Sequence, residues 1–245
     1  MSDLVVDIGN SRVKWALAAS GRVIGSGRAV AHDNLELLFA EWSRLSAPPQ
    51  ALRGVSGPAS AGTQAEIEQW AMTHWDLAPD WLVTPAIGGG VQVAYATPTE
   101  LGTDRWLAMV GAKAAGQAPA CIIDCGSAIT LDVLNADGRH QGGLILPGLG
   151  AQQTGLTGLA PGLPRVDWPN STPFLANNTP DALASGYLHG TAMALQGLWQ
   201  QCAANAPEAL PAVLTGGDAV LISRYLDRSV TLRPDLVLEG IAALQ

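Results

Sequence analysis

Residues 7–14 read DIGNSRVK, and 117 residues after Asp7 a related stretch, residues 124–132, reads DCGSAITLD. In both stretches a short apolar run leads into an aspartate, and a glycine follows two residues later. A glycine there lets the backbone bend sharply after a strand and lets main-chain N–H groups approach a phosphate closely. The two stretches therefore predict two strand-turn-strand units of the same design.

The similarity continues beyond these turns. At the same offset Gly21-Arg22 matches Gly138-Arg139, in segments with the composition of hairpin turns. Each half of the chain is therefore predicted to begin with a three-strand meander. Two such units, facing each other, would oppose their Asp-x-Gly turns across a cleft. Chance similarity between two unrelated hairpins is the alternative interpretation.

The remainder of the chain alternates between strand and helix patterns, which is typical of an α/β fold. We expect strands at residues 52–57 and 213–217, and a glycine- and proline-rich loop at residues 142–150. The predicted helices are residues 35–45, residues 63–75, a long helix from 178 to about 205 with Thr179 as its N-cap, and helices beginning at 218 and 234. The repeat predicts two similar domains, residues 1–117 and 118–245.

Composition narrows the class of protein. The 245 residues are 48% hydrophobic and 14% charged, which is enough apolar material for packed cores. The net charge of −8 disfavours a nucleic-acid partner, because binding to a phosphate backbone needs a basic surface. Three cysteines and four histidines lack the spacing of a metal site. No signal peptide or membrane-length apolar stretch is apparent, so we expect a cytoplasmic protein without membrane contact.

The first stretch combines groups that suit a triphosphate. Asp7 at a strand end would hold Mg²⁺ through water, Gly9 would admit the phosphate, and Lys14 would add positive charge. In the second stretch, Asp124 and Ser127 repeat the carboxylate and the hydroxyl. Either stretch alone is more simply interpreted as an ordinary turn, whereas the presence of two copies favours phosphate binding.

A third candidate site lies at residues 98–105, just before an apolar helical pattern. The N-terminus of that helix would favour an anion. Asp104 is a candidate base for a substrate hydroxyl, and Arg105 is a candidate anion clamp. In the alternative interpretation, Asp104 only caps the helix and Arg105 is a surface charge.

Taken together, these motifs resemble those of the type III pantothenate kinases, a family that includes proteins described as Bvg accessory factors. The resemblance covers most of the chain, in the order of the family. It rests on residues 7–10 with Lys14, 101–105, 124–132, 142–148 and 178–179. Ser11 and Ser127 stand where family members commonly have threonine, and both keep a hydroxyl.

The resemblance implies the duplicated fold of the acetate and sugar kinases, Hsp70 and actin, an actin-like ATPase fold. It also implies ATP-dependent phosphorylation of (R)-pantothenate to 4′-phosphopantothenate, the first step of coenzyme A biosynthesis, with Mg²⁺ accompanying ATP. The protein would be a homodimer, and Asp124 would bind a monovalent metal or ammonium cation, K⁺ or NH₄⁺.

The resemblance assigns the site residues one by one. Asp104 would be the catalytic proton acceptor. The residues implied to bind ATP are Asp7, Ile8, Gly9, Asn10, Ser11, Arg12, Val13, Lys14 and Ser127. Those implied to bind pantothenate are Tyr95, Gly102, Thr103, Asp104, Arg105 and Thr179.

Other functions remain open at this stage. A kinase of the same fold could phosphorylate another small alcohol, because phosphate-binding turns do not specify the acceptor. A nucleotide-binding regulator without catalysis would also fit, and an actin-like filament protein fits less well because the chain is short. The intact Asp7, Asp104, Arg105 and Asp124 favour an enzyme.

Overall fold

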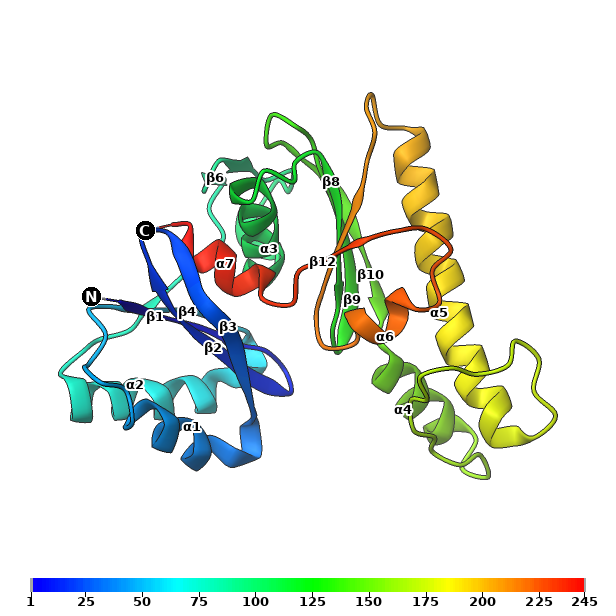
Figure 1. Cartoon of the computed structure of the whole chain (residues 1–245), viewed down its shortest axis with the longest axis horizontal. Helices are drawn as coiled ribbons and strands as arrows, with labels where there is room; N and C mark the ends of the chain where they lie inside the picture. The colour runs from blue at the N-terminus through cyan, green and yellow to red at the C-terminus, as the bar shows by residue number, and fades with distance from the viewer. Residues whose placement is uncertain (1, 245) are drawn as a thin grey trace. The chain divides into compact units, whose positions relative to one another are not determined.

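A computed structural model describes residues 2–244 and divides them into two compact units. The first unit is built from the residues up to 118, residues 138–140 and the residues from 235 onward, and the second from residues 119–137 and 141–234. The first unit thus includes the C-terminal helix, which is drawn in red in Figure 1. The two-domain division at residue 117 stays a prediction.

The first unit contains a five-stranded sheet in the order β3-β2-β1-β4-β5. Its strands are β1 (Asp3–Ile8), β2 (Arg12–Ala19), β3 (Arg22–Ala31), β4 (Leu52–Ser56) and β5 (Asp80–Trp81). The central strand β1 pairs antiparallel with β2 and parallel with β4. Because β1 has a hydrogen-bonded neighbour on both sides, the turn that follows it starts from a fixed point.

The second unit repeats this topology, with the order β10-β9-β8-β11-β12. Its strands are β8 (Ala120–Cys125), β9 (Ala128–Leu134), β10 (His140–Pro147), β11 (Ala212–Thr215) and β12 (Thr231–Leu232). Here β8 takes the place of β1, antiparallel to β9 and parallel to β11. The matching strand orders confirm the predicted pair of meanders.

The turn between β2 and β3 has the conformation that its sequence predicts, whereas the loop predicted at residues 142–150 is absent. Ser20 and Gly21 both have positive φ, 51° and 73°, as the two-residue turn between β2 and β3 requires. The stretch 142–150 is not the loop that its glycines and proline suggested. Its residues as far as Pro147 belong to β10, because they pair with β9 in the sheet, and only Gly148 separates β10 from the following helix.

Most helices follow the predicted pattern with shifted ends, but the helix at residues 149–159 was not predicted. Those of the first unit are α1 (Leu35–Trp42), α2 (Ala61–Trp75), α3 (Thr103–Ala114) and α7 (Leu236–Ala242), with short 3₁₀ turns η1 (His32–Asn34), η2 (Pro58–Ser60) and η3 (Pro98–Glu100) and a small hairpin of β6 (Ile87–Gly88) and β7 (Val91–Gln92). Those of the second unit are α4 (Leu149–Leu159), α5 (Thr179–Ala204) and α6 (Ala219–Ser223). None of the helices within residues 2–244 is long and apolar enough to cross a membrane.

The N-cap of the long helix α5 differs from the prediction. Asn178, not Thr179, is the cap, because the Asn178 side-chain oxygen accepts a hydrogen bond from the Asp181 N–H at 3.0 Å. The Asn178 amide also donates to the Asp181 carboxylate at 2.7 Å. An asparagine cap satisfies an otherwise unpaired N–H of the first helical turn. Thr179 therefore occupies the first helical position and is exposed.

A tryptophan-rich core supports the first sheet. Trp42 of α1 is 1% exposed and packs edge-on against Trp15 of β2 and against Trp70 of α2. In Figure 1, α1 and α2 lie on one side of this sheet, whereas α7 and α3 lie on the other. Aromatic side chains of this size bury a large apolar area between the sheet and helices α1 and α2. Helices α7 and α3 cover the other face of the sheet.

Helices α3 and α7 pack so closely that glycine is required at their crossing. A Cβ on Gly240 of α7 would lie 2.0 Å from the Leu107 carbonyl oxygen of α3, and one on Gly111 would lie 2.3 Å from the Leu236 carbonyl oxygen.

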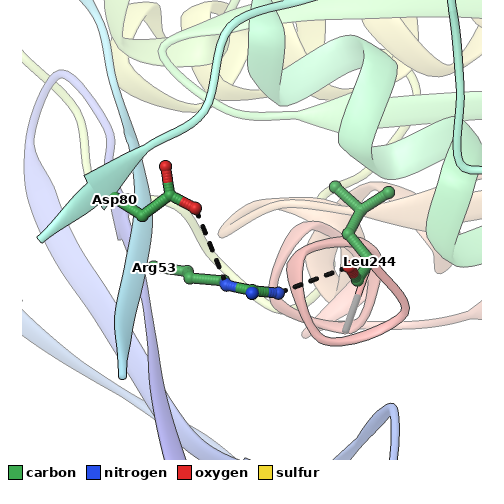
Figure 2. A network of polar contacts seen from close by, with 3 residues as sticks. All are labelled: Arg53, Asp80 and Leu244. Atoms are coloured by element: carbon green, nitrogen blue, oxygen red, sulfur yellow. Dashed lines mark hydrogen bonds and ion pairs between the residues drawn. The ribbon is translucent and has the colours of Figure 1, made fainter.

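Arg53 of β4 contacts both the C-terminal segment and β5 (Figure 2). Its guanidinium donates to the Leu244 carbonyl at 3.3 Å, and its Nε lies 3.7 Å from the Asp80 carboxylate. The C-terminal segment is therefore tied to β4 as well as to α3.

We predict that Gly240→Ala destabilises the protein by about 2–4 kcal/mol, because the added methyl group meets backbone atoms that cannot rotate away. Urea unfolding followed by circular dichroism measures the change. Gly197→Ala is the matched control, since Gly197 is an exposed residue of α5 with open space around its Cα. That control should be neutral or stabilising by up to about 1 kcal/mol. Equal destabilisation by both variants would contradict the close-packing argument.

Candidate functional site

The first Asp-x-Gly turn joins β1 to β2. The last strand pair before it is Ile8 with Val13, and the Gly9 N–H closes the turn by donating to the Arg12 carbonyl at 3.1 Å. Asp7 lies directly opposite Lys14 in the antiparallel pair, so the two side chains share one face of the sheet. The turn therefore presents a carboxylate and an ammonium group beside exposed main chain.

The residues predicted to bind ATP in this stretch differ in exposure. Asn10, Ser11 and Arg12 are exposed, whereas the side chains of Ile8 and Val13 are 2% and 0% exposed and pack in the core of the unit. Ile8 and Val13 can therefore offer a ligand only their main-chain atoms. Their apolar side chains hold the strands on either side of the turn.

The motif at residues 102–105 forms the N-terminus of α3. Gly102 is the N-cap, and Asp104 is exposed in the first turn. One oxygen of the Asp104 carboxylate accepts from the Arg105 N–H at 2.9 Å. A Cβ on Gly102 would come within 2.5 Å of that same oxygen. Glycine is thus the residue that leaves room for the carboxylate to lie against the helix end.

Arg105 is a buried cation, only 6% exposed. Its guanidinium donates to the Tyr95 hydroxyl at 3.1 Å and lies 5.8 Å from the centre of the Tyr95 ring. The His140 ring stacks on Tyr95 with ring centres 6.0 Å apart, and His140 Nδ1 accepts from the Ala94 N–H at 3.4 Å. The interpretation of Arg105 as a surface charge is therefore wrong, because Arg105 is buried and its guanidinium is bonded to Tyr95.

Sequence reasoning missed two residues that support this motif. The Thr84 hydroxyl, 2% exposed, lies 2.9 Å from the Leu101 carbonyl oxygen and 3.2 Å from the Thr103 hydroxyl. His140 is one of the four histidines without the spacing of a metal site, and no motif includes it. Both are far from residues 101–105 in sequence, and neither belongs to a recognisable pattern.

The second Asp-x-Gly turn is tighter than the first. Its last strand pair is Cys125 with Ile129, and the Gly126 N–H donates to the Ala128 carbonyl at 3.1 Å. Ser127 is exposed at its tip, and its carbonyl accepts from the Gly148 N–H at 3.2 Å. A Cβ on Gly148 would lie 2.3 Å from the Gly126 carbonyl oxygen, so this glycine permits the contact.

Two carboxylates give the second turn a negative field. Burial raises the pKa of the Cys125 thiol, and the nearby charges of Asp124 and Asp218 raise it further. Gly216, with φ of 93°, passes so close that a Cβ there would lie 2.3 Å from an Asp124 carboxylate oxygen. The place of Asp124 is thus fixed by the glycine turn after β11.

The carboxylates suit hard cations that keep much of their own hydration. Among residues 2–244 no group of three or more histidine, cysteine or acidic side chains could enclose a metal ion. Mg²⁺ needs no such cage, because it commonly binds one or two carboxylates together with water and substrate phosphates. Asp7 and Asp124, each at a strand end, fit that mode of binding.

The site residues fall into three groups. Residues 7–14 form one turn, and Tyr95 with residues 102–105 forms a second group around the end of α3, both in the first unit. Asp124 and Ser127 belong to the second unit, as does Thr179 at the start of α5. Chemically, the first turn offers exposed residues beside a carboxylate and an ammonium group, and the end of α3 offers an exposed carboxylate next to the buried Arg105. The second turn offers the negative charge of Asp124 and Asp218.

Comparison with known proteins gives a consistent result. The protein-family model described as "Type III pantothenate kinase" matches residues 3–201. A type III pantothenate kinase of Nitrosococcus oceani is 37% identical over 248 residues, which cover 98% of this chain and 92% of that protein.

Two solved structures share the fold at low sequence identity. The first is a protein described as a Baf family transcriptional activator from Campylobacter jejuni, with a TM-score of 0.61, 18% identity, and coverage of 98% of this chain and 96% of that one. The second is the activator of 2-hydroxyisocaproyl-CoA dehydratase from Clostridium difficile with bound ADPNP, with a TM-score of 0.56, 13% identity, and coverage of 100% and 90%.

The buried thiols predict a loss of stability at high pH. Burial raises the pKa of Cys121 as well as that of Cys125. The unfolded chain releases these thiol protons above about pH 8.5, whereas the folded protein keeps them. The stabilisation is therefore complete below that pH and is lost as the pH rises, by at most about 1.4 kcal/mol per pH unit for each thiol.

Urea unfolding at pH 7.5 and pH 10 measures this effect. The double variant Cys121→Ala with Cys125→Ala should be less stable at pH 7.5 but should lose less stability between the two pH values than the wild type. Other groups titrate in both proteins, so only the difference between them reports on the thiols. Identical losses would show that the thiols do not contribute.

Proposed function

This chain belongs to the type III pantothenate kinase family and phosphorylates pantothenate for coenzyme A biosynthesis, and we propose which of its residues perform each part of that reaction. Its duplicated α/β architecture is the actin-like ATPase fold. As a kinase it uses ATP with a divalent metal ion. Family membership favours the enzyme over the regulator and over a kinase for another alcohol. The geometry at the N-terminus of α3 carries the proposal.

Asp104 is the proposed proton acceptor for the substrate hydroxyl. It is exposed, while one of its carboxylate oxygens is held by the Arg105 N–H at 2.9 Å. The other oxygen accepts the proton as the hydroxyl oxygen attacks the γ-phosphorus of ATP and the bond from that phosphorus to ADP breaks. Phosphoryl transfer depends mainly on positioning and charge stabilisation, so a fixed carboxylate is the appropriate group.

Arg105 is the proposed partner of the pantothenate carboxylate. Its guanidinium is already oriented by the Tyr95 hydroxyl at 3.1 Å, so little side-chain entropy remains to be lost on binding. Gly102, Thr103 and Tyr95 lie around it and are proposed to complete the substrate contacts, with Thr179 contributing from α5. A guanidinium and a carboxylate pair through parallel hydrogen bonds, which favours an acid over a neutral alcohol.

Residues 7–14 are the proposed binding segment for the ATP phosphates, with Ser127 as a further ATP contact. Ile8 and Val13 take part through main chain only, because their side chains are buried. Asp7 is proposed to hold Mg²⁺ through water. When bound, the ion neutralises negative charge on the phosphates, and Lys14 adds to that effect at the position opposite Asp7.

Asp124 is the proposed site of a monovalent cation, K⁺ or NH₄⁺. The charges of Asp124 and Asp218 raise the pKa of the Cys125 thiol, which supports a negative potential at this turn. A cation there would offset the repulsion between the carboxylates and a nearby polyphosphate.

We also propose a homodimer in the cytoplasm. The homodimer follows from the resemblance of this sequence to the family, and a cytoplasmic location is consistent with a kinase of that family. Sedimentation equilibrium of the purified chain tests the first, and a mass of one chain at micromolar concentration would exclude it.

Replacement of the proposed base should abolish most of the activity without unfolding the protein. Asp104→Asn should lower kcat by about 100-fold to 10,000-fold, because it removes a proton acceptor from an exposed position. A coupled assay of pantothenate-dependent ADP release measures kcat. Asp76→Asn is the matched control, since Asp76 ends α2 in the left-handed conformation that asparagine also adopts. Near-normal turnover of Asp104→Asn would remove Asp104 from this role.

The cation proposal predicts a specific salt dependence. ADP release should be faster in KCl or NH₄Cl than in NaCl at equal ionic strength. Asp124→Asn should reduce this difference, because it removes the charge proposed to hold the ion. The same initial rate in all three salts for the wild-type enzyme would rule out the site, whatever the variant does.

A further inference from the structure

The carbonyl oxygen of Gly9 in the first turn is held by two side chains that belong to none of the motifs. His32 Nε2 lies 2.7 Å from this oxygen, and the Ser60 hydroxyl donates to it at 3.2 Å. His32 begins η1 directly after β3, and Ser60 ends η2 directly before α2. Two elements distant in sequence thus converge on one peptide group of the turn.

The contact with the Gly9 carbonyl requires a proton on Nε2 of His32. A carbonyl oxygen can only accept a hydrogen bond, so Nε2 must carry the proton. The other ring nitrogen, Nδ1, lies 2.9 Å from the hydroxyl of Thr63 in the first turn of α2, and in the neutral ring it accepts from that hydroxyl. Thr63 therefore orients the imidazole for its bond to Gly9.

The position of the Gly9 carbonyl determines where the next N–H points. The peptide bond between Gly9 and Asn10 is planar, and in its trans form the C=O and N–H groups point in opposite directions. His32 and Ser60 hold the oxygen on the inner side of the turn, where Ser60 is 3% exposed. The Asn10 N–H is consequently turned to the outer side, where Asn10 is exposed.

We propose that His32, Ser60 and Thr63 form a carbonyl clamp that orients the Asn10 N–H to bind an ATP phosphate. This inference rests on the proposed binding of ATP phosphates by residues 7–14. The three residues act through the main chain of the turn and are positioning residues. By fixing the peptide plane before ATP arrives, they reduce the conformational entropy that binding must remove.

The second turn is supported by a main-chain contact, whereas side chains hold the first, so the clamp is specific to the first turn. There the main chain of Gly148 contacts the turn, with its N–H donating to the Ser127 carbonyl at 3.2 Å. The clamp should therefore affect the part of ATP binding that residues 7–14 provide. It should leave pantothenate binding unchanged.

Steady-state kinetics with each substrate varied in turn tests the clamp. His32→Ala and Ser60→Ala should each raise the KM for ATP about fivefold to tenfold, the effect of losing one hydrogen bond, with the KM for pantothenate unchanged. His32→Gln should recover much of the loss, because its side-chain amide can donate to the Gly9 carbonyl in place of Nε2–H. His74→Ala, at an exposed histidine near the end of α2, is the control and should leave both KM values unchanged.

The alternative outcomes separate this inference from the proposed function. Lys14→Ala, in the turn segment itself, should raise the KM for ATP. If it does so while His32→Ala and Ser60→Ala lower only the melting temperature, the clamp is purely structural and the inference fails alone. If Lys14→Ala leaves the KM for ATP unchanged, the ATP assignment of residues 7–14 and the clamp fail together. Nitrogen-15 NMR of His32 provides a second readout, and protonation at Nδ1 alone would overturn the clamp.

Discussion

The structure depends on the pairing of one central strand in each sheet with neighbours on both sides. β1 is hydrogen-bonded to β2 and β4, and β8 is bonded to β9 and β11. A strand held on both sides cannot shift without breaking two ladders, so the residues at its end keep their positions. Asp7 and Asp124 occupy these ends. A carboxylate placed in this way can face a polyphosphate without being pushed aside by the repulsion between them.

The sheet topology could be predicted because its determinants are local. Asp-x-Gly and Gly-Arg turns at a matched offset indicated two meanders, and backbone conformation at Ser20 and Gly21 is a property of the turn itself. The predictions that were wrong or missing concern features that the neighbouring residues in sequence do not determine. Pro147 and its glycine-rich surroundings are compatible with a loop, yet pairing in the sheet makes them strand β10. The inclusion of α7 in the first unit depends on contacts with α3, more than a hundred residues away.

The same distinction applies to the candidate site. Residues 7–14, 102–105 and 124–127 lie in motifs, so sequence identified them. The residues that hold these motifs could not be found in this way, because Thr84, His140 and Ser60 gain their roles only when the chain folds. Arg105 shows the consequence most clearly, since sequence left open a surface charge and the structure encloses it beside Tyr95. Motifs therefore indicated the chemistry, and tertiary structure supplied the rigidity that the chemistry needs.

Rigidity matters especially here because this acidic chain is proposed to bind two anions. With a net charge of −8 it has no general positive field to attract ATP or pantothenate. In the proposed sites, attraction comes from short-range groups: main-chain N–H groups, a helix N-terminus, the buried guanidinium of Arg105, and Lys14 with the metal ion. Hydrogen bonds weaken steeply with misalignment, so donors of this kind are effective only when they are already aimed. If the proposed sites hold, the glycine contacts around Asp104 and Asp124 and the bonds to the Gly9 carbonyl contribute to binding by keeping these donors and carboxylates in place.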